Sequence, residues 1–201
     1  GYSKTYYRRC MQKLTTCEKV ETVRARLEAL VCDMDTDEDN YVLYDACMQV
    51  LNDQAFQNQV GSCDHHHTYR GGLMVHTYEV ASYALEMAKT FGEAVDRNVL
   101  LTAAIWHDYM KVREYEVDEA GKIGKTPYRK LVRHVAGSHA EFLLAVAGKG
   151  LDPDIQMRIE HALLAHHGRQ EWGSPVEPQT LESHLLHSAD MISVRFGKDL
   201  W

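Results

Sequence analysis

Apolar residues recur at three- and four-residue spacing along most of the chain, and no other feature of the sequence constrains the fold as strongly. Glycines and an Asp-Pro pair separate the periodic segments, at Gly92, Gly148, Gly150, Asp152-Pro153 and Gly168. Such residues typically end helices or form the turns between them. We therefore predict an all-α fold, a helical bundle. The predicted helices span residues 17–32, 40–60, 72–91, 95–110, 130–148, 153–167 and 178–196.

One segment departs from the helical pattern. Between Val112 and Tyr128, Glu114-Tyr-Glu-Val117 is followed by Asp118-Glu-Ala-Gly-Lys-Ile-Gly124, which favours a small β-hairpin or an irregular loop. We therefore predict a hairpin or loop insertion near residues 112–128. We also expect two parts in the chain: an N-terminal helical extension over residues 1–40, loosely attached over its first 35 residues, and a helical domain over residues 41–201.

The composition is that of an ordinary globular domain. The chain has 201 residues, 45% hydrophobic and 25% charged, which is enough to bury one core. Its five cysteines are odd in number and lack metal-type spacing, which indicates a reduced, cytoplasmic compartment. No apolar run approaches the roughly 20 residues of a membrane span, and the N-terminus lacks a signal peptide's apolar stretch. We therefore expect a cytoplasmic protein without a membrane partner.

The charge is acidic overall but basic in one stretch. The formal net charge of −7 argues against a general nucleic-acid-coating surface, because such proteins usually carry a net basic face. The local stretch is interpreted either as an attractor of phosphate groups or as a solvated mixed-charge loop. Its basic residues are Lys111, Arg113, Lys122, Lys125, Arg129, Lys130 and Arg133, against the acidic Glu114, Glu116, Asp118 and Glu119.

Histidines and aspartates that can bind metal are spaced along the chain from residue 76 onward. Neutral imidazole and carboxylate together suit manganese, iron, zinc or magnesium, whereas a thiolate site needs paired cysteines. No Cys-x-x-Cys pair occurs. We therefore predict a site for one or two divalent metal ions and, with it, a metal-dependent hydrolase. The candidate ligands are His76, His107, Asp108, His134, His166, His167 and Asp190.

Apolar surroundings single out some of these candidates. His107 and Asp108 follow the apolar segment Leu100–Trp106, and Asp190 stands on an apolar stretch of the last predicted helix. A buried charge without a partner costs several kcal/mol, and a metal ion supplies a partner. Because a carboxylate has two oxygens, Asp108 can bridge two ions, and we predict that it is the pivotal residue.

Glycines accompany the other candidates. The turn Gly71-Gly72 opens the predicted helix of His76, and glycines there let the backbone pass close to a metal ion or a phosphate. His166 and His167 end a helix that Gly168 stops. Neighbouring helical residues point about 100° apart. Both histidines can therefore bind one ion most readily at a helix end.

Together these motifs resemble those of a known enzyme family. His76, followed by His107-Asp108 and by Asp190 on a helical scaffold, resembles the HD-domain phosphohydrolase superfamily. The segments His66–Thr77, His107–Lys111, His166–Pro175 and Leu186–Asp190 resemble the HD domain of the YhaM-type 3′-to-5′ exoribonucleases. The resemblance covers roughly residues 42 to 196 and implies an HD phosphohydrolase domain over residues 41–201.

The resemblance also implies which residues bind each ion. The core ligands are His76, His107, Asp108 and Asp190, and a second ion is bound by His134, His166 and His167. His134 is the choice for the middle ligand because the family has a small residue four positions further on, here Ser138, and His139 is the alternative. Met110 departs from the family's usual glycine. The first 40 residues are too short for the oligonucleotide-binding barrel that precedes the HD domain in those exonucleases.

Catalysis and substrate binding are assigned in the same way. Asp108 and Lys111 are the predicted catalytic residues, with a water near Asp108 attacking phosphorus and Lys111 neutralising phosphate charge. The predicted substrate-binding residues are His66, His67, Arg70 and Arg133. Arg70 is equally compatible with a surface salt bridge. Manganese or iron is the expected metal, and magnesium, nickel and zinc are compatible.

Three functions remain open. The first is a divalent-metal-dependent phosphohydrolase that cleaves phosphoester bonds of nucleotides or of the 3′ end of short single-stranded nucleic acids. The second is a relaxase component that processes DNA in conjugative transfer, because His65-His66-His67, Gly71-Gly72 and His76 resemble HD-type relaxases, although Val60–Asp64 replaces their usual Pro-Ala-Ser-Glu run. The third is a non-catalytic nucleotide-binding sensor, against which the intact ligand set counts. Substrate size, RNA versus DNA and a homo-oligomeric state stay open, as does whether Trp172 stacks on a base or packs its loop onto the core.

Overall fold

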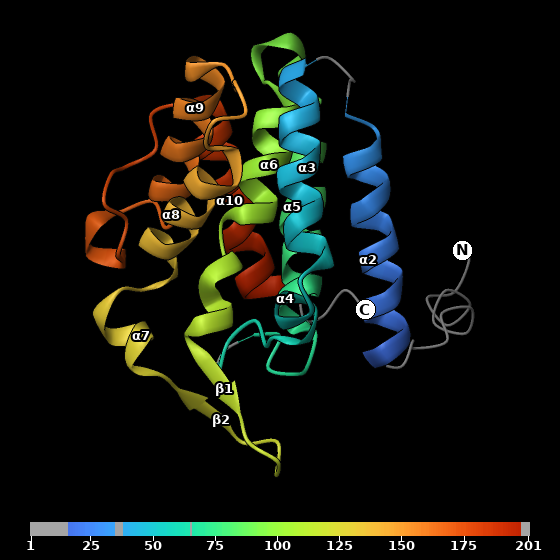
Figure 1. Cartoon of the computed structure of the whole chain (residues 1–201), viewed down its shortest axis with the longest axis vertical. Coiled ribbons are helices and arrows are strands. Elements are labelled where there is room, and N and C mark those ends of the chain that lie inside the picture. The colour runs from blue at the N-terminus through green and yellow to red at the C-terminus, as the bar shows by residue number, and fades with distance from the viewer. Residues whose placement is uncertain (1–15, 35–37, 65, 198–201) are drawn as a thin grey trace, which may run out of the picture.

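The computed structural model describes residues 16–34, 38–64 and 66–197, and these form a helical bundle (Figure 1), as the all-α prediction requires. The helices are α2 (Thr16–Cys32), α3 (Glu38–Asn52), α4 (Gln54–Asn58), α5 (Gly72–Ala88), α6 (Arg97–Trp106), α7 (Pro127–Leu131), α8 (His134–Val146), α9 (Pro153–Ala165) and α10 (Leu181–Phe196). Short 3-10 helices are η1 (Gly92–Ala94), η2 (Tyr109–Arg113) and η3 (Gln170–Trp172). The strands are β1 (Tyr115–Val117) and β2 (Ile123–Lys125).

Helices α5 and α6 form the centre of the bundle. Helix α5 packs against α2, α6 and α10, and α6 also packs against α3 and α9. In Figure 1, α2 (blue) lies on one side of this pair, and α8 and α9 (orange) lie on the other. Every residue from Val99 to Trp106 of α6 is buried. The His107-Asp108 pair therefore emerges from the most enclosed helix of the bundle.

Side-chain caps begin the helices that carry several candidate ligands. Oδ1 of Asp96 accepts hydrogen bonds from the backbone N–H groups of Asn98 and Val99 at the start of α6, at 2.9 and 3.0 Å. Asp152 caps α9 in the same way, and Thr180 begins α10 with a reciprocal capping box. Such caps satisfy N–H groups that the first turn of a helix leaves unpaired.

Two predicted helices are each divided in the structure. The predicted helix over residues 40–60 stops at Asn52, and Asp53 caps the short α4. The predicted helix over residues 130–148 is interrupted between α7 and α8, where Arg133 has φ 69° and ψ 155°. Residues with a side chain rarely adopt this region. Apolar spacing alone does not locate such breaks.

The predicted insertion is an antiparallel β-hairpin. Tyr115 pairs with Lys125 and Val117 pairs with Ile123. Figure 1 shows the hairpin projecting from one end of the bundle. The backbone N–H of Thr126 donates to the carbonyl of Glu114 at 3.0 Å. The insertion therefore leaves the bundle just after the His-Asp motif and returns to the same place.

Helix α2 packs into the common core. Val23, Leu27 and Val31, spaced four residues apart, are fully buried, and α2 contacts α5 and α3. The expected loose attachment is therefore wrong for residues 16–32, while residues 1–15 lie outside the described residues. The division at residue 40 stays a prediction. None of the helices in the described part of the chain is both long and apolar enough to cross a membrane.

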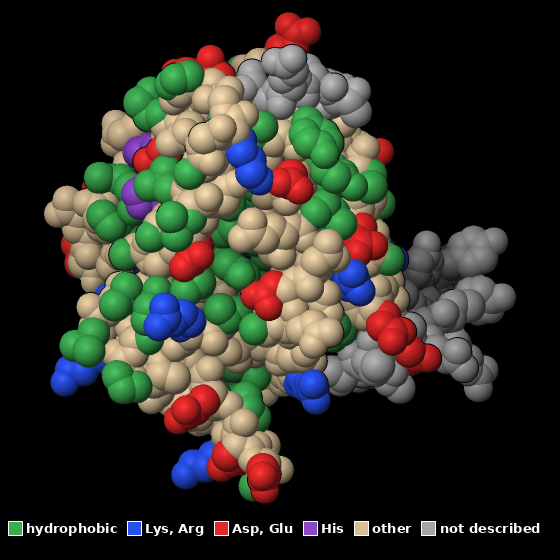
Figure 2. Space-filling model, viewed as in Figure 1, with side chains coloured by type: hydrophobic (Ala, Val, Ile, Leu, Met, Phe, Trp, Pro, Cys, Tyr) green, Lys and Arg blue, Asp and Glu red, His purple; other side chains and the backbone are tan. Residues whose placement is uncertain are grey.

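The surface agrees with the acidic composition. On the face shown in Figure 2, Lys and Arg side chains (blue) stand singly among acidic (red) and apolar (green) ones. That face offers no continuous basic area for a nucleic acid to cover. On this face, any attraction for phosphate is therefore local.

Candidate metal centre

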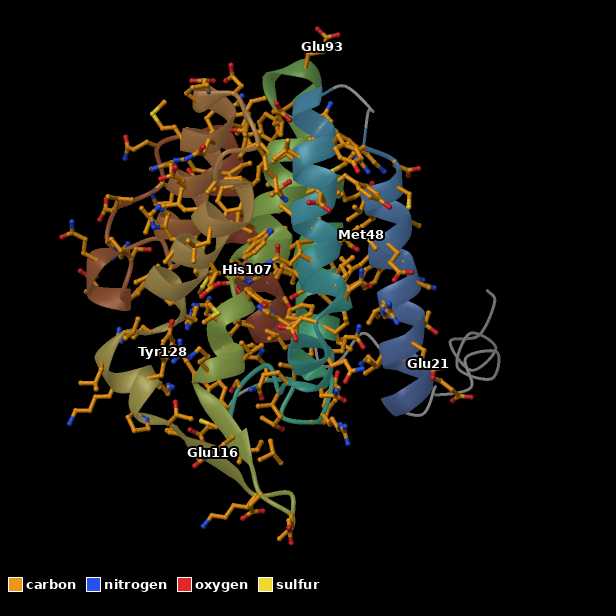
Figure 3. All side chains as sticks on the ribbon, viewed as in Figure 1. Glu21, Met48, Glu93, His107, Glu116 and Tyr128 are labelled. Carbon is orange, nitrogen blue, oxygen red and sulfur yellow. The ribbon has the colours of Figure 1, made fainter. Side chains whose placement is uncertain are left out.

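The predicted metal ligands come from five helices and meet inside the bundle. They are His76 on α5, His107 and Asp108 after α6, His134 at the start of α8, His166 and His167 after α9, and Asp190 on α10. Figure 3 labels His107, which lies in the middle of the bundle between the outer helices. The fold thus brings together every ligand that the sequence nominated.

Three of these side chains form an enclosed group, the inner cluster of His76, His107 and Asp190. Nε2 of His76 lies 3.3 Å from Nε2 of His107 and 3.2 Å from Oδ1 of Asp190. Oδ2 of Asp108 lies 3.2 Å from Nε2 of His76 and 3.5 Å from Nε2 of His107. Both imidazoles are fully buried. Two nitrogens and two carboxylates thus converge on one point.

The other three histidines, His134, His166 and His167, form the outer cluster. Nε2 of His134 lies 3.2 Å from Nε2 of His167. Oδ1 of Asp108 faces this cluster, 3.2 Å from Nε2 of His134 and 3.7 Å from Nε2 of His166. The two carboxylate oxygens of Asp108 therefore face different clusters, as a bridging carboxylate does.

Backbone carbonyls fix two of the imidazole rings. Nδ1 of His107 donates to the carbonyl of Ala104, and Nδ1 of His166 donates to the carbonyl of Leu163, both at 2.7 Å. Because a carbonyl oxygen can only accept, Nδ1 carries the proton, and in a neutral ring Nε2 presents its lone pair. Metal-binding histidines are commonly held in this way.

The remaining rings of the outer cluster also donate a hydrogen bond from Nδ1. Nδ1 of His167 donates to the carbonyl of Trp172 at 3.0 Å. Nδ1 of His134 donates to Oε1 of Glu114 at 2.8 Å, and the backbone N–H of His134 donates to the same oxygen at 2.7 Å. Their Nε2 atoms are thereby left for a ligand on the cluster side.

A serine and a second buried carboxylate hold His76. Oγ of Ser193 accepts from Nδ1 of His76 at 2.8 Å and donates to Oε2 of Glu79 at 2.7 Å. Sequence analysis missed Ser193, Glu79 and Glu114. Glu79 could have been recognised from the sequence, because it is the single acidic residue between Leu73 and Ala84. Nothing in the local sequence distinguishes Glu114 from the acids of the following hairpin.

The geometry of the clusters fits divalent metal ions. Nε2 atoms that face each other across 3.2 or 3.3 Å repel when both present lone pairs, unless a proton or a metal ion lies between them. Two ligands at about 2.1 Å from one ion stand about 3.0–3.4 Å apart at octahedral or tetrahedral angles. Nε2 of His166 is buried and has no hydrogen bond to any described residue. Imidazole with carboxylate suits manganese, iron or zinc.

Burial and charge set the protonation of the rings. Burial lowers the pKa of His107 to about 4 and that of His167 to about 2, so both are neutral at physiological pH, the form that binds metal. Burial also opposes charge on His76, but Asp108 and Asp190 raise its pKa to about 9. The inner cluster therefore attracts positive charge.

Lys111 holds Asp108 in place. Its Nζ lies 2.6 Å from Oδ2 of Asp108 and donates to the carbonyl of Gly61 at 3.1 Å. Burial disfavours both charges, yet the pKa of Lys111 is raised by Asp108, and the pKa of Asp108 is held well below its usual range by Lys111. Lys111 thus keeps Asp108 ionised and oriented.

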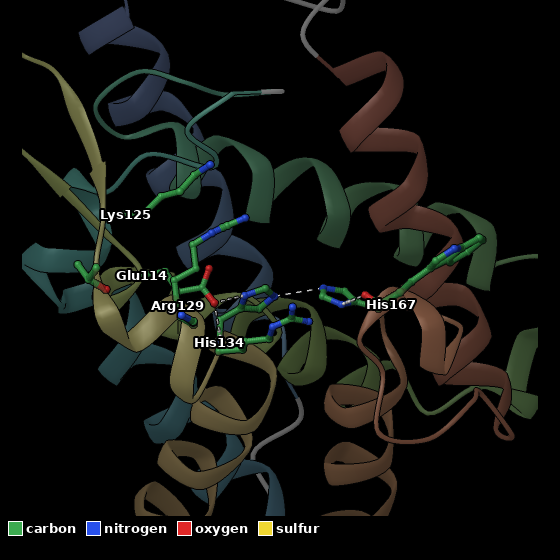
Figure 4. A pocket seen from close by; sticks show the side chains of 9 residues that line it. Glu114, Lys125, Arg129, His134 and His167 are labelled. Carbon is green, nitrogen blue, oxygen red and sulfur yellow. Dashed lines mark hydrogen bonds and ion pairs between the residues drawn. The ribbon is translucent and has the colours of Figure 1, made fainter.

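Two pockets open beside the clusters. The first, the basic pocket, has a volume of about 400 Å³, and the second, the mixed pocket, about 460 Å³. His167 and Trp172 line both, so they separate one from the other. The basic pocket is further lined by Lys125, Arg129, Lys130, Arg133, His134 and Glu114 (Figure 4). The mixed pocket is further lined by His66, Asp108, Lys111, Asp190, Met191, Val194 and Arg195.

The structure separates the predicted substrate-binding residues. His66 lines the mixed pocket and Arg133 lines the basic pocket. His67 is only 3% exposed, and its Nε2 lies 3.0 Å from Oε2 of Glu79, beneath the site. Arg70 lines a third pocket beside the hairpin. His67 and Arg70 are therefore not brought to either pocket at the clusters, because one is turned into the core and the other lies along the hairpin.

The glycine turn before α5 packs against protein. Gly71 has φ 83°, and a Cβ there would lie 2.5 Å from a methyl carbon of Val20. A Cβ on Gly72 would lie 2.0 Å from the carbonyl oxygen of His67. These glycines therefore allow close packing against α2 and against the backbone of His67, where the sequence predicted a close approach to a metal ion or a phosphate.

Two further residues were left open by the sequence. Nε2 of His139 lies 2.9 Å from Oε2 of Glu160, away from the clusters, whereas His134 lies in the outer cluster. Trp172 is 48% exposed, with the guanidinium of Arg169 4.9 Å from the centre of its ring. Trp172 therefore lines both pockets and is not buried in the core.

Comparison with protein families gives two matches. The model of the HD domain matches residues 73–195, more than half of the chain, and this range contains all the candidate metal ligands. A second model, whose description names a helicase, matches residues 40–102, which end before His107 and Asp108. No solved structure matches the chain.

Several curated proteins are similar to the chain. The 3′-5′ exoribonuclease YhaM of Bacillus pumilus is 28% identical over 146 residues, 72% of this chain and 45% of that protein. YhaM of Bacillus subtilis is 27% identical over 71% of this chain and 44% of its own length. YhaM of Listeria monocytogenes serotype 4b is 28% identical over 68% and 43%. The chain thus spans less than half the length of the relatives it matches.

Proposed function

Because the chain belongs to the HD domain family of metal-dependent hydrolases, we propose that it is a phosphohydrolase of nucleotides or of the 3′ end of short nucleic acids, with manganese or iron as its metal. The observation that carries the proposal is the position of Asp108, whose two oxygens face the inner and the outer cluster. One carboxylate between two sets of imidazoles suits two ions that act on a single phosphate group. The proposed functional unit is residues 41–201, with residues 1–40 as an extension.

Each cluster has a distinct part in this proposal. The inner cluster and Oδ2 of Asp108 would hold one ion, and the outer cluster and Oδ1 of Asp108 would hold the second. When bound, such ions polarise a phosphoryl oxygen and lower the pKa of an attacking water. Glu114 and Ser193 keep the imidazole lone pairs directed at the site. Lys111 keeps Asp108 ionised between them.

The two pockets are the proposed binding region for the substrate. The scissile phosphate lies at Asp108, where the mixed pocket reaches the clusters. Lys111 and His66 line that pocket and Arg133 lines the other, so positive or hydrogen-bonding groups stand on both sides of the phosphate. The relatives are named as exoribonucleases, which supports the 3′ end of RNA as one substrate.

One second candidate has an observation in its favour. The helicase-described model matches residues 40–102, where the sequence resembles relaxases, and this supports DNA processing. That range holds His66 and His76 but lacks Asp108 and the outer cluster. Phosphohydrolysis uses both clusters and is therefore preferred to DNA processing. It is also preferred to a non-catalytic sensor, because a sensor needs no bridging carboxylate.

A substrate panel with added manganese tests the proposal. It contains nucleoside mono- and triphosphates, bis(4-nitrophenyl) phosphate, and short RNA and DNA labelled so that 3′ shortening is visible. We expect the wild type to hydrolyse at least one of them and Asp108→Ala to hydrolyse none. Progressive shortening identifies an exonuclease, and turnover of nucleotides alone identifies a nucleotidase. Equal activity of wild type and Asp108→Ala would contradict the proposal.

A further inference from the structure

The basic pocket opens directly onto the outer cluster. His134 and His167 belong to the cluster and also line the pocket, and Figure 4 shows them facing each other at its inner end. A Cβ built on Gly173 would lie 2.9 Å from Nη1 of Arg133 and 3.4 Å from Nδ1 of His167. The guanidinium of Arg133 therefore lies next to an outer-cluster ring. A group bound at the clusters is an immediate neighbour of this pocket.

The pocket carries uncompensated positive charge. Among the described residues, Arg129, Lys130 and Arg133 form no ion pair with a carboxylate within 4.0 Å. Lys125 pairs with the exposed Asp64 at 3.0 Å. Glu114, the one acid among the described lining residues, is occupied by two hydrogen bonds from His134. Several positive charges that line one pocket with a single acid favour an anion, and arginine is well suited to phosphate.

The pocket wall is held in shape without a ligand. A Cβ on Gly137 would lie 2.0 Å from Oη of Tyr128, so α7 packs tightly against α8. The guanidinium of Arg113 lies 4.5 Å from the ring centre of Tyr128. The guanidinium of Arg129 lies 5.3 Å from that of Tyr115. These contacts fix the hairpin and α7 on the bundle, so binding an anion requires little reordering.

The two pockets differ in the groups they offer. The mixed pocket has as many acids as bases beside its apolar residues: Asp108 and Asp190, Lys111 and Arg195, and Met191 and Val194. A phosphodiester has an organic substituent on each side of its phosphate, and two pockets that share one wall at the clusters can each receive one. A substituent that carries its own phosphate meets balanced charge in the mixed pocket but an excess of positive charge in the basic pocket, so the basic pocket attracts it more strongly.

We propose that the basic pocket is a subsite for a second phosphate, adjacent along the substrate to the phosphate that is hydrolysed. The preferred substrate then carries at least two phosphates, as in a dinucleotide with a terminal phosphate or a longer strand, and a substrate with one phosphate leaves the subsite empty. This proposal rests on the proposed function for the position of the scissile phosphate. It gives Lys125, Arg129 and Lys130 a role that neither the family match nor the relatives assign.

The test compares substrates that differ only in a terminal phosphate. The dinucleotide UpU has one phosphate, and pUpU and UpUp each have two, on opposite ends. We expect kcat/KM for cleavage of the internal bond, with manganese, to be about tenfold higher for one of the two phosphorylated forms, the gain expected from a charged hydrogen bond. In the variant Arg129→Ala/Lys130→Ala the gain should fall below about twofold.

A matched control removes the same charge elsewhere. In Lys89→Ala/Lys122→Ala, the two lysines are exposed, and they stand at the end of α5 and in the hairpin turn, outside both pockets at the clusters. This control should keep the tenfold gain. Lys130→Ala alone, at an exposed position, tests the same point if the double variant does not fold. Equal kcat/KM for all three dinucleotides, or a gain that survives Arg129→Ala/Lys130→Ala, would overturn the subsite.

A binding measurement separates this proposal from the proposed function. Calorimetry with the manganese-loaded protein compares uridine 3′,5′-bisphosphate with the 3′- and 5′-monophosphates. We expect the bisphosphate to bind about tenfold more tightly, and the preference to be lost in Arg129→Ala/Lys130→Ala. If no dinucleotide is cleaved but this preference holds, hydrolysis is the part that fails. If dinucleotides are cleaved but the preference is missing, the subsite fails.

Discussion

The inner and outer clusters use the same kinds of ligand but differ in how the fold holds them. His76 and Asp190 lie within core helices α5 and α10, and His107 follows α6 directly. The outer cluster stands where helices begin or end, and its His167 is partly exposed and lines both pockets. Ligands within packed helices move little, whereas helix ends and turns move more easily. The inner cluster is therefore the rigid half of the site.

The clusters also differ in charge. The inner cluster contains the carboxylate of Asp190 and faces Asp108, while the outer cluster consists of imidazoles and faces Asp108 alone. A second carboxylate strengthens the attraction for a divalent cation. We therefore expect the inner ion to bind more tightly and the outer ion to exchange and to meet the substrate.

The largest effect is expected where the two clusters join. Asp108→Ala removes an oxygen from each, so both ions should be lost and kcat/KM should fall about a thousandfold or more. Elemental analysis of the purified protein and the substrate panel measure both quantities. Asp118→Ala, in the hairpin turn, is the control and should behave as wild type. Retention of both ions by Asp108→Ala would show that the clusters are not joined through this residue.

A smaller effect should fall on the outer cluster alone. His134→Ala removes one of its three imidazoles, so we expect the bound metal to fall from two ions towards one per chain, with the inner ion retained. Metal titration followed by calorimetry counts the ions. His139→Ala is the matched control, since its ring pairs with Glu160 outside the clusters. A loss of metal in His139→Ala but not in His134→Ala would reverse the choice of middle ligand.

The carboxylate behind His134 should have a weaker effect. Glu114→Gln keeps the shape of the side chain but removes the charge that orients the imidazole, which typically costs about tenfold or more in metal affinity. The affinity of the outer ion should fall and that of the inner ion should not. Glu116→Gln, exposed on β1, is the control. An equal loss at both ions would mean that the clusters are not held independently.

The smallest effect is expected for a residue that the sequence placed at the substrate. Arg70 lines the third pocket and donates from Nε to Oδ1 of Asn58 at 2.8 Å. Because it lies outside both pockets at the clusters, Arg70→Ala should change kcat/KM less than about twofold. The comparison variant is Arg133→Ala, which should lower it more. A larger loss of kcat/KM in Arg70→Ala would show that Arg70 does bind the substrate.

The sequence by itself determined the helical class, the place of the insertion and the family. Helical spacing of apolar residues and polar caps are local features, so they are visible without a structure. The nomination of His76, His107, Asp108 and Asp190 as ligands also needed only residue chemistry and the motif order. The assignment of the chain to the HD domain family is confirmed by the match over residues 73–195.

Only the tertiary structure decided which groups surround those ligands. Glu114 and Ser193 support rings on other segments, Glu79 accepts a hydrogen bond from Ser193, and Ser193 lies 117 residues from His76. The turn of His67 into the core and the position of Arg129 and Lys130 beside His134 likewise depend on how α5, the hairpin and α8 pack. Sequence spacing shows which residues share one face of a helix. Contacts between residues on distant segments depend instead on how the whole bundle packs.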